Sequence, residues 1–564
     1  MEDSVSSNAA QPLSKFTKKF KLQLARTEII SRREKKAATR VTCGLYCLIL
    51  CSFGVVFPIS DALTNSIDIS GYYTESYQIV LFICAIGAML YVFIDLVRRA
   101  KPKPSTVEPQ TQVQPNPGWN IEFSSLQRVP GSDGIELSER ERIAEGEWVY
   151  PEVCLGGEGS NLYYRIGGIV FALGSITFCE LRLIAPYEGV IPRDCYPLYK
   201  QVANGIMVIF VVMQTVLFVK YHQLVVNRCK PFVRFCMMHL VATNLALWLS
   251  ATTHETVADV RKKLTEERNE TDVCHSGGAY YDKAVGFIYP CVVEYGLFGA
   301  GAAYIMYLNV GKGFSERTVV ESDTDEPSAP FCDKTIWHKR CGRAYVGLIV
   351  GVVIMILTLI GVIVYHTASG NMEYTFLVME ILLIMIAASA GIFVYMLLRD
   401  LKYVGLEEDN FDGSLLIITQ AGVYALYLFI MLGAINAIRT GDEFNYGVFF
   451  LVQSILCMGQ STLQTYTVLD GFSRSAHKTE HAEKKPGQNV ITLLICVNFS
   501  MWMSATFLFA NADDQDLFSD YFGIIPWSMI TRMFSPLVIF YRFQASICLS
   551  DIWENAYKTR GKAE

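Results

Sequence analysis

The chain has few charged residues: Asp, Glu, Lys and Arg make up only 18% of its 564 residues, whereas 52% are hydrophobic. Water alone does not dissolve a chain of this composition, which excludes a soluble enzyme of several domains. The motifs of soluble catalysis are also missing: there is no Walker A loop, no HExxH, and no GxGxxG or GxSxG in a plausible context. We therefore expect no ATP-driven pump, no enzyme activity and no cofactor.

Metal-binding cysteine motifs are lacking too, although the sequence has 16 cysteines. No CxxC pair occurs, and Cys332 with Cys341 lacks enough neighbouring ligands for a zinc finger. Most cysteines lie inside apolar segments, where a thiol behaves as a small hydrophobic group. No metal site is predicted.

The apolar residues are gathered into segments of about 20 residues, which as helices cross about 30 Å of hydrocarbon. The sequence therefore predicts an all-α polytopic membrane protein with 12 transmembrane helices. The predicted helices span 41–63, 77–97, 164–186, 200–221, 231–254, 285–309, 344–366, 374–398, 414–437, 446–470, 488–510 and 524–552.

Between and around these helices the sequence predicts cytoplasmic tails and linkers. Residues 1–40 form a basic tail, and 101–159, rich in Pro, Gln, Ser, Glu and Gly, form a disordered linker. A second linker, 311–343, separates the six-helix domain 41–310 from the six-helix domain 344–553, and 554–564 form the other tail. The formal net charge of −6 argues weakly against a nucleic-acid partner.

The orientation follows from loop charge, because Lys and Arg gather in the loops on the amino-terminal side. We expect a multi-pass plasma-membrane protein with both termini in the cytoplasm. The sequon at Asn269 then lies in an exterior loop, where glycosylation is expected. Cys195 and Cys274 are the only cysteines in exterior loops; a disulfide is predicted, with free thiols as the alternative.

An internal repeat relates the two halves. Three polar residues recur in register on the fourth, fifth and sixth helices of each half: Gln214, Asn244 and Tyr295 in the first, and Gln464, Asn498 and Tyr541 in the second. Because six is an even number, the repeats are expected to be parallel. Such side chains point inward in a membrane, either as a proton pathway or as structural links between helices.

Carboxylates inside or at the ends of the apolar segments are further candidates, because buried ionisable groups often mark ion or proton pathways. They are Asp61, Asp95, Glu180, Glu255, Glu294, Glu373, Glu380 and Asp470. Glu294 stands out, since its repeat counterpart is Phe540.

Histidine and arginine supply the remaining candidates. Glu255 with His254 is a possible protonatable entrance, or an interfacial helix end in contact with water. His239 is either a proton relay or a hydrogen-bonded structural residue. Arg542 and Arg532, deep in the last helix, require acidic partners, so a structural salt bridge is expected.

At these positions the chain resembles the otopetrins, a family of proton-selective channels. The motifs that carry the resemblance are Met238-His239-Leu240 followed by Asn244 and Trp248, Tyr164-Arg165-Ile166-Gly167, and Ile539-Phe540-Tyr541-Arg542-Phe543. The resemblance implies acid-activated proton permeation in a homodimer, with cholesterol-like lipid between helices. It also implies that the two Gln-Asn-Tyr sets are the polar triads of that family and that Glu255 takes part in conduction.

One residue departs from the family pattern: Gln544 stands where a histidine usually follows the Tyr-Arg-Phe motif. Glutamine does not titrate near neutral pH, so the pH response at this position is in question. The resemblance thus implies a proton channel, for which we expect proton pathways in each half and at the interface between the halves. The alternatives are a proton-coupled secondary transporter with the same six-plus-six repeat, or a receptor or scaffold without ion flux.

Overall fold

The structure is a computed structural model that describes most of the chain outside the tails and linkers. The described residues are 38–61, 72–97, 153–155, 162–188, 196–268, 279–311, 344–367, 373–405, 411–441, 443–477, 481, 484–510 and 516–557. Among them are 12 helices long and apolar enough to cross a membrane. The predicted class of an all-α polytopic membrane protein is therefore confirmed.

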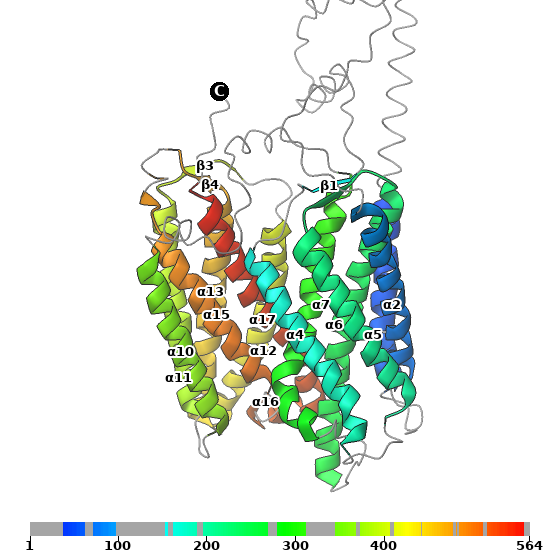
Figure 1. Cartoon of the computed structure of the whole chain (residues 1–564). Helices are drawn as coiled ribbons and strands as arrows, with labels where there is room; N and C mark the ends of the chain where they lie inside the picture. Colours follow the sequence, from blue (N-terminus) through cyan, green and yellow to red (C-terminus); the bar gives the residue numbers. More distant parts are fainter. Residues whose placement is uncertain are drawn as a thin grey trace, which may run out of the picture.

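The helices stand side by side in one bundle (Figure 1). Those of the first half are Ala38–Asp61, α2 (Tyr72–Tyr91), α4 (Leu162–Ile184), α5 (Leu198–Tyr221), α6 (Lys230–Arg268) and α7 (Ala279–Asn309). Those of the second half are α10 (Tyr345–Thr367), α11 (Glu373–Leu398), α12 (Phe411–Thr440), α13 (Phe444–Phe472), α15 (Gln488–Ala510), α16 (Asp516–Phe522) and α17 (Ile524–Asn555).

Some boundaries differ from those predicted. A π-helix, η2 (Val92–Val97), continues α2, and a 3-10 turn, η3 (Ala185–Tyr187), follows α4. Helix α6 runs on to Arg268, through residues that the sequence assigned to a loop, because the stretch after Thr253 contains neither proline nor glycine to end it. The short helix α16 was not predicted.

Two pairs of short strands lie at one end of the bundle, which we call the strand end (Figure 1). Strand β1 (Val153–Leu155) pairs with β2 (Leu224–Val226), and β3 (Lys402–Tyr403) pairs with β4 (Arg474–Ser475), both antiparallel. Strands β2 and β4 follow the fourth helix of their respective halves. The prediction of disorder for 101–159 is wrong at Val153–Leu155, because this apolar run buries Val153 and has a strand partner; the other residues of that linker lie outside the described residues.

The buried side chains form two clusters, one for each half. In the most apolar stretch of each helix, 72% of the residues of α6 and of α7 are buried, against 17% in the first helix, so α6 and α7 form the centre of the first half. The last helix, α17, packs against α6, α7 and α4 across the boundary. Its face with Phe540, Phe543 and Ile547 joins the first cluster, whereas Tyr541 and Leu549 join the second.

Candidate functional site

The first polar site lies where α5, α6 and α7 meet. Gln214 and Asn244 exchange two hydrogen bonds: Gln214 Nε2 donates to Asn244 Oδ1 at 2.9 Å and Asn244 Nδ2 donates to Gln214 Oε1 at 2.8 Å. Asn244 Nδ2 also donates to the Leu240 carbonyl oxygen at 2.7 Å. Both side chains are fully buried, so each amide satisfies the other's hydrogen-bonding groups away from water.

Tyr295 completes this site through the neighbour of Gln214 rather than through the amide pair. Its hydroxyl lies 3.0 Å from Thr215 Oγ1 and donates to the Val211 carbonyl oxygen at 3.1 Å. A side chain on Gly299, one turn further along α7, would not fit here: its Cβ would lie 2.3 Å from Asn244 Oδ1 and 2.7 Å from Gln214 Nε2. The glycine therefore allows the amide pair to form against α7.

The same contacts recur between α13, α15 and α17. Gln464 Nε2 donates to Asn498 Oδ1 at 2.7 Å, and Asn498 Nδ2 donates back at 3.1 Å. The Tyr541 hydroxyl lies 3.0 Å from Thr465 Oγ1 and donates to the Ser461 carbonyl oxygen at 2.8 Å. The structure thus brings each predicted Gln-Asn-Tyr set together, with an equivalent threonine and an equivalent backbone carbonyl.

The second site carries two groups without equivalents in the first. Gln460 Nε2 donates to Gln464 Oε1 at 2.6 Å, and its own Oε1 accepts from Arg542 at 2.5 Å. Arg542 also donates to Cys457 Sγ at 3.2 Å. The salt bridge predicted for Arg542 is not seen among the described residues, where the Gln460 amide oxygen and the Cys457 sulfur accept from its guanidinium.

Arg532 does form a salt bridge, which joins the two halves. Its Nη1 lies 2.6 Å from Glu255 Oε1, so α17 is tied to α6 at the end of the bundle opposite the strands. The Glu255 side chain is 25% exposed and that of Arg532 is 9% exposed. Glu255 is therefore within reach of water at the boundary between the halves.

Glu294 is buried next to Tyr295 on α7, with 1% of its surface exposed. Neither carboxylate oxygen has a hydrogen-bond partner among the described residues. A buried polar group without a partner is costly, and one that persists calls for an explanation by function or by a bound water.

His239 connects three helices of the first half. Its Nδ1 lies 2.8 Å from the Tyr46 hydroxyl of the first helix, and its Nε2 lies 3.3 Å from the Leu81 carbonyl oxygen of α2. Both ring nitrogens are thus engaged, which fits a structural histidine as well as a relay.

A small cavity in the second half holds Glu380, one of the carboxylate candidates from the sequence. Glu380 of α11 accepts from Gln453 Nε2 at 2.5 Å and from Ser504 Oγ at 2.9 Å. It lines a cavity of about 20 Å³ together with Tyr427 and Arg542, which is room for about one water molecule.

The two polar sites also lie within the part of the chain that matches a known protein family. The otopetrin family matches residues 163–278 and 265–543, which include both Gln-Asn-Tyr sites. The chain belongs to the otopetrin family.

Relatives of the chain are named as proton channels. The chain is 24% identical to Proton channel OtopLc of Drosophila melanogaster, over 92% of this chain and 35% of that protein. It is 23% identical to human Proton channel OTOP3, over 69% of this chain and 73% of that protein, and 19% identical to human Proton channel OTOP2, over 56% and 69%. The chain thus spans about a third of the length of the Drosophila relative.

Gln544, the residue that departs from the otopetrin pattern, is buried on α17. Its Nε2 donates to Asp412 Oδ1 of α12 at 3.2 Å, and its Oε1 has no partner among the described residues. The amide therefore sits against a carboxylate near the strand end of the second half.

His222 follows α5 at the strand end of this otopetrin and was not a candidate from the sequence. Burial, and secondly the charge of Arg165, lower the pKa of His222.

Three predicted site residues lie outside the described residues: Cys195 and Cys274, predicted to form a disulfide, and Asn269, predicted to carry a glycan.

Proposed function

We propose that the chain is a proton channel of the otopetrin type, which conducts protons into the cell when the outer solution becomes acidic. The observation that carries the proposal is the buried Gln-Asn-Tyr site that recurs in both halves, with the carboxyl of Glu294 beside the first. Hydroxyl and carboxyl groups with single waters pass protons along, whereas a hydrated metal ion needs a wider opening.

In the proposed orientation the strand end faces the cytoplasm and the opposite end faces outside, in the plasma membrane. Glu255 then meets the outer solution at the boundary between the halves. Glu294 serves as a proton-binding station further in: a charged carboxylate there would cost several kcal/mol, so we expect it to rest with its proton on. Glu294 contributes to conduction by releasing this proton and then binding another.

Further features belong to the same proposal. The two halves are parallel repeats, the protein is a homodimer in contact with membrane lipid and cholesterol, and the exterior loops carry a Cys195–Cys274 disulfide and a glycan on Asn269. The recurring contacts of the two polar sites support the repeat. His239, bonded to Tyr46 and near Leu81, is a relay candidate of the first half.

The experiment that tests the proposal uses the purified full chain in liposomes that contain a pH-sensitive dye. An acid step outside, with potassium and valinomycin to balance charge, should acidify the lumen without any added substrate. A proton-coupled secondary transporter would show flux only when its substrate is present, and a receptor or scaffold would show none. Either of those results would overturn the proton-channel proposal.

A further inference from the structure

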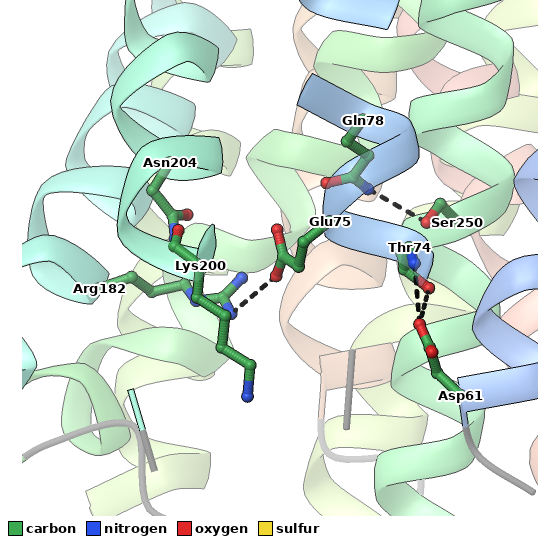
Figure 2. A network of polar contacts seen from close by, with 8 residues as sticks. All are labelled: Asp61, Thr74, Glu75, Gln78, Arg182, Lys200, Asn204 and Ser250. Atoms are coloured by element: carbon green, nitrogen blue, oxygen red, sulfur yellow. Dashed lines mark hydrogen bonds and ion pairs between the residues drawn. The ribbon is translucent and has the colours of Figure 1, made fainter. Parts of the chain in front are cut away.

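A charged cluster occupies the end of the first half opposite the strands (Figure 2). Glu75, in the first turn of α2, lies 3.4 Å from Arg182 Nη2 of α4, and Lys200 of α5 adds a second nearby positive charge. The Glu75 side chain is only 12% exposed. Neither the otopetrin match, which begins at residue 163, nor the Gln-Asn-Tyr site includes this carboxylate.

The Glu75–Arg182 contact is a loose one. At 3.4 Å it is longer than the roughly 2.7–2.9 Å of a strong charge-assisted hydrogen bond. Asp61, the other carboxylate close by, is instead engaged at the start of α2, where it accepts from the Thr74 backbone amide at 2.8 Å and from Thr74 Oγ1 at 2.5 Å. Asp61 therefore has a structural role, and Glu75 is the less firmly held carboxylate of the two.

Polar groups continue inward from Glu75 along α2 and α6. One turn further along α2, Gln78 Nε2 donates to Ser250 Oγ of α6 at 3.1 Å, as Figure 2 shows. Ser250 is six residues from Asn244 on the same helix, which is about 9 Å along its axis. The Gln78–Ser250 contact thus lies between Glu75 and the Gln214–Asn244 pair along these helices.

Among the described residues of the second half, the positions that correspond to Glu75 and Lys200 carry no charge. The Gln78–Ser250 contact has its equivalent in Glu380–Ser504, because Ser250 and Ser504 each lie six residues after the asparagine of their site. Three residues before Glu380, in the position of Glu75, stands Leu377.

Phe450 likewise stands where the first half has Lys200, since each lies 14 residues before the glutamine of its site. Leu377 and Phe450 are both buried. Phe450 packs against Phe518 at 5.0 Å between ring centroids, and Phe518 against Trp527 at 4.6 Å. Buried apolar and aromatic side chains thus fill, in the second half, the positions that carry Glu75 and Lys200 in the first half.

We propose that Glu75 is the carboxylate through which the first half takes up protons from the outer solution, with Arg182 and Lys200 setting the external pH at which it does so. The inference rests on the proposed proton-channel function. A proton from hydronium binds a Glu75 oxygen, weakens its contact with Arg182, and then passes to water next to Ser250. The other titratable groups around Glu75 are Asp61, Cys179 of α4 and Tyr199 of α5.

The test is whole-cell recording of the full chain while the outer solution is stepped from neutral to acid pH. Glu75→Gln keeps the size of the side chain but cannot bind the proton, so the acid-evoked current should fall at least about tenfold. Arg182→Gln keeps the carboxylate and removes a positive charge. Its current should persist, with half-activation at a higher pH by about one unit.

The matched control is Glu443→Gln, which removes an exposed carboxylate at the same end of the bundle. Surface biotinylation corrects each current for the amount of protein at the membrane, and if Glu75→Gln fails to reach the surface, the pH shift of Arg182→Gln decides alone. Equal currents and equal pH dependence for Glu75→Gln and the native chain would overturn the inference. So would a smaller current in Arg182→Gln with an unchanged half-activation pH, because that result identifies a structural brace. If the native chain itself passes no proton current, the proposed function fails.

Discussion

At the scale of single residues, Glu294 is the most informative side chain. Its carboxyl is buried without a hydrogen-bond partner among the described residues, and its repeat counterpart is Phe540. Glu294→Gln replaces a protonated carboxyl by an amide of similar size, so the fold should be kept while proton binding is lost. We expect the acid-evoked current to fall about tenfold or more, measured by whole-cell recording. An unchanged current with an unchanged pH dependence would rule out Glu294 as a proton-binding station.

Gly299 tests whether the Gln214–Asn244 pair matters as a unit. In Gly299→Ala the new methyl group would collide with both amides, and separating them leaves buried polar groups unpaired, at about 1–3 kcal/mol for each. Proton flux into liposomes should drop severalfold. The matched control is Gly205→Ala on α5, where an added Cβ has no atom within 4 Å. Equal flux in the two variants would contradict a role for the pair.

At the scale of helices, close packing between α10 and α15 depends on Gly347. A Cβ there would lie 1.9 Å from the Asn489 carbonyl oxygen, so Gly347→Ala forces the two helices apart. Overpacking of this kind costs about 1–3 kcal/mol, and the melting temperature in detergent should fall. Gly459→Ala on α13, with no atom within 4 Å of the added Cβ, should melt like the native protein. A native-like melting temperature for Gly347→Ala would show that this contact is easily relieved.

The helices themselves could be predicted from the sequence, because long apolar segments in a membrane have few alternatives to the α-helix. Their ends could not. The second helix was predicted to begin at residue 77, but α2 begins at Tyr72, so Glu75 fell in a predicted loop and was not among the predicted intramembrane carboxylates. Helix α16 was missed because it has only seven residues, two of them aspartates, and so gives no spanning signal.

The contacts within each polar site were partly predictable. The sequence related Gln214 to Gln464 and Asn244 to Asn498 through their common register, and the structure pairs each glutamine with the asparagine of its own half. The partner of Arg542 was not predictable, because the amide oxygen of Gln460 accepts a hydrogen bond from the guanidinium but carries no charge that would mark it in the sequence.

At the scale of the whole molecule, the ion pair between Arg532 and Glu255 joins the two halves. Removing one partner, as in Arg532→Gln, leaves Glu255 without this cation and should cost about 2 kcal/mol. The melting temperature in detergent should fall, and the exchange variant that places Glu at 532 and Arg at 255 should recover most of the loss. No difference between Arg532→Gln and the native chain would show that hydrophobic packing of α17 alone holds the halves together.

The central claim is that the whole molecule conducts protons selectively. The most direct measurement is the reversal potential of the acid-evoked current in whole-cell recording, with large impermeant cations replacing sodium and potassium. For a proton channel it should follow the proton gradient, by about 59 mV per unit of pH difference. A reversal potential that does not move with the pH difference, or the absence of any current from protein shown to be at the cell surface, would contradict the account.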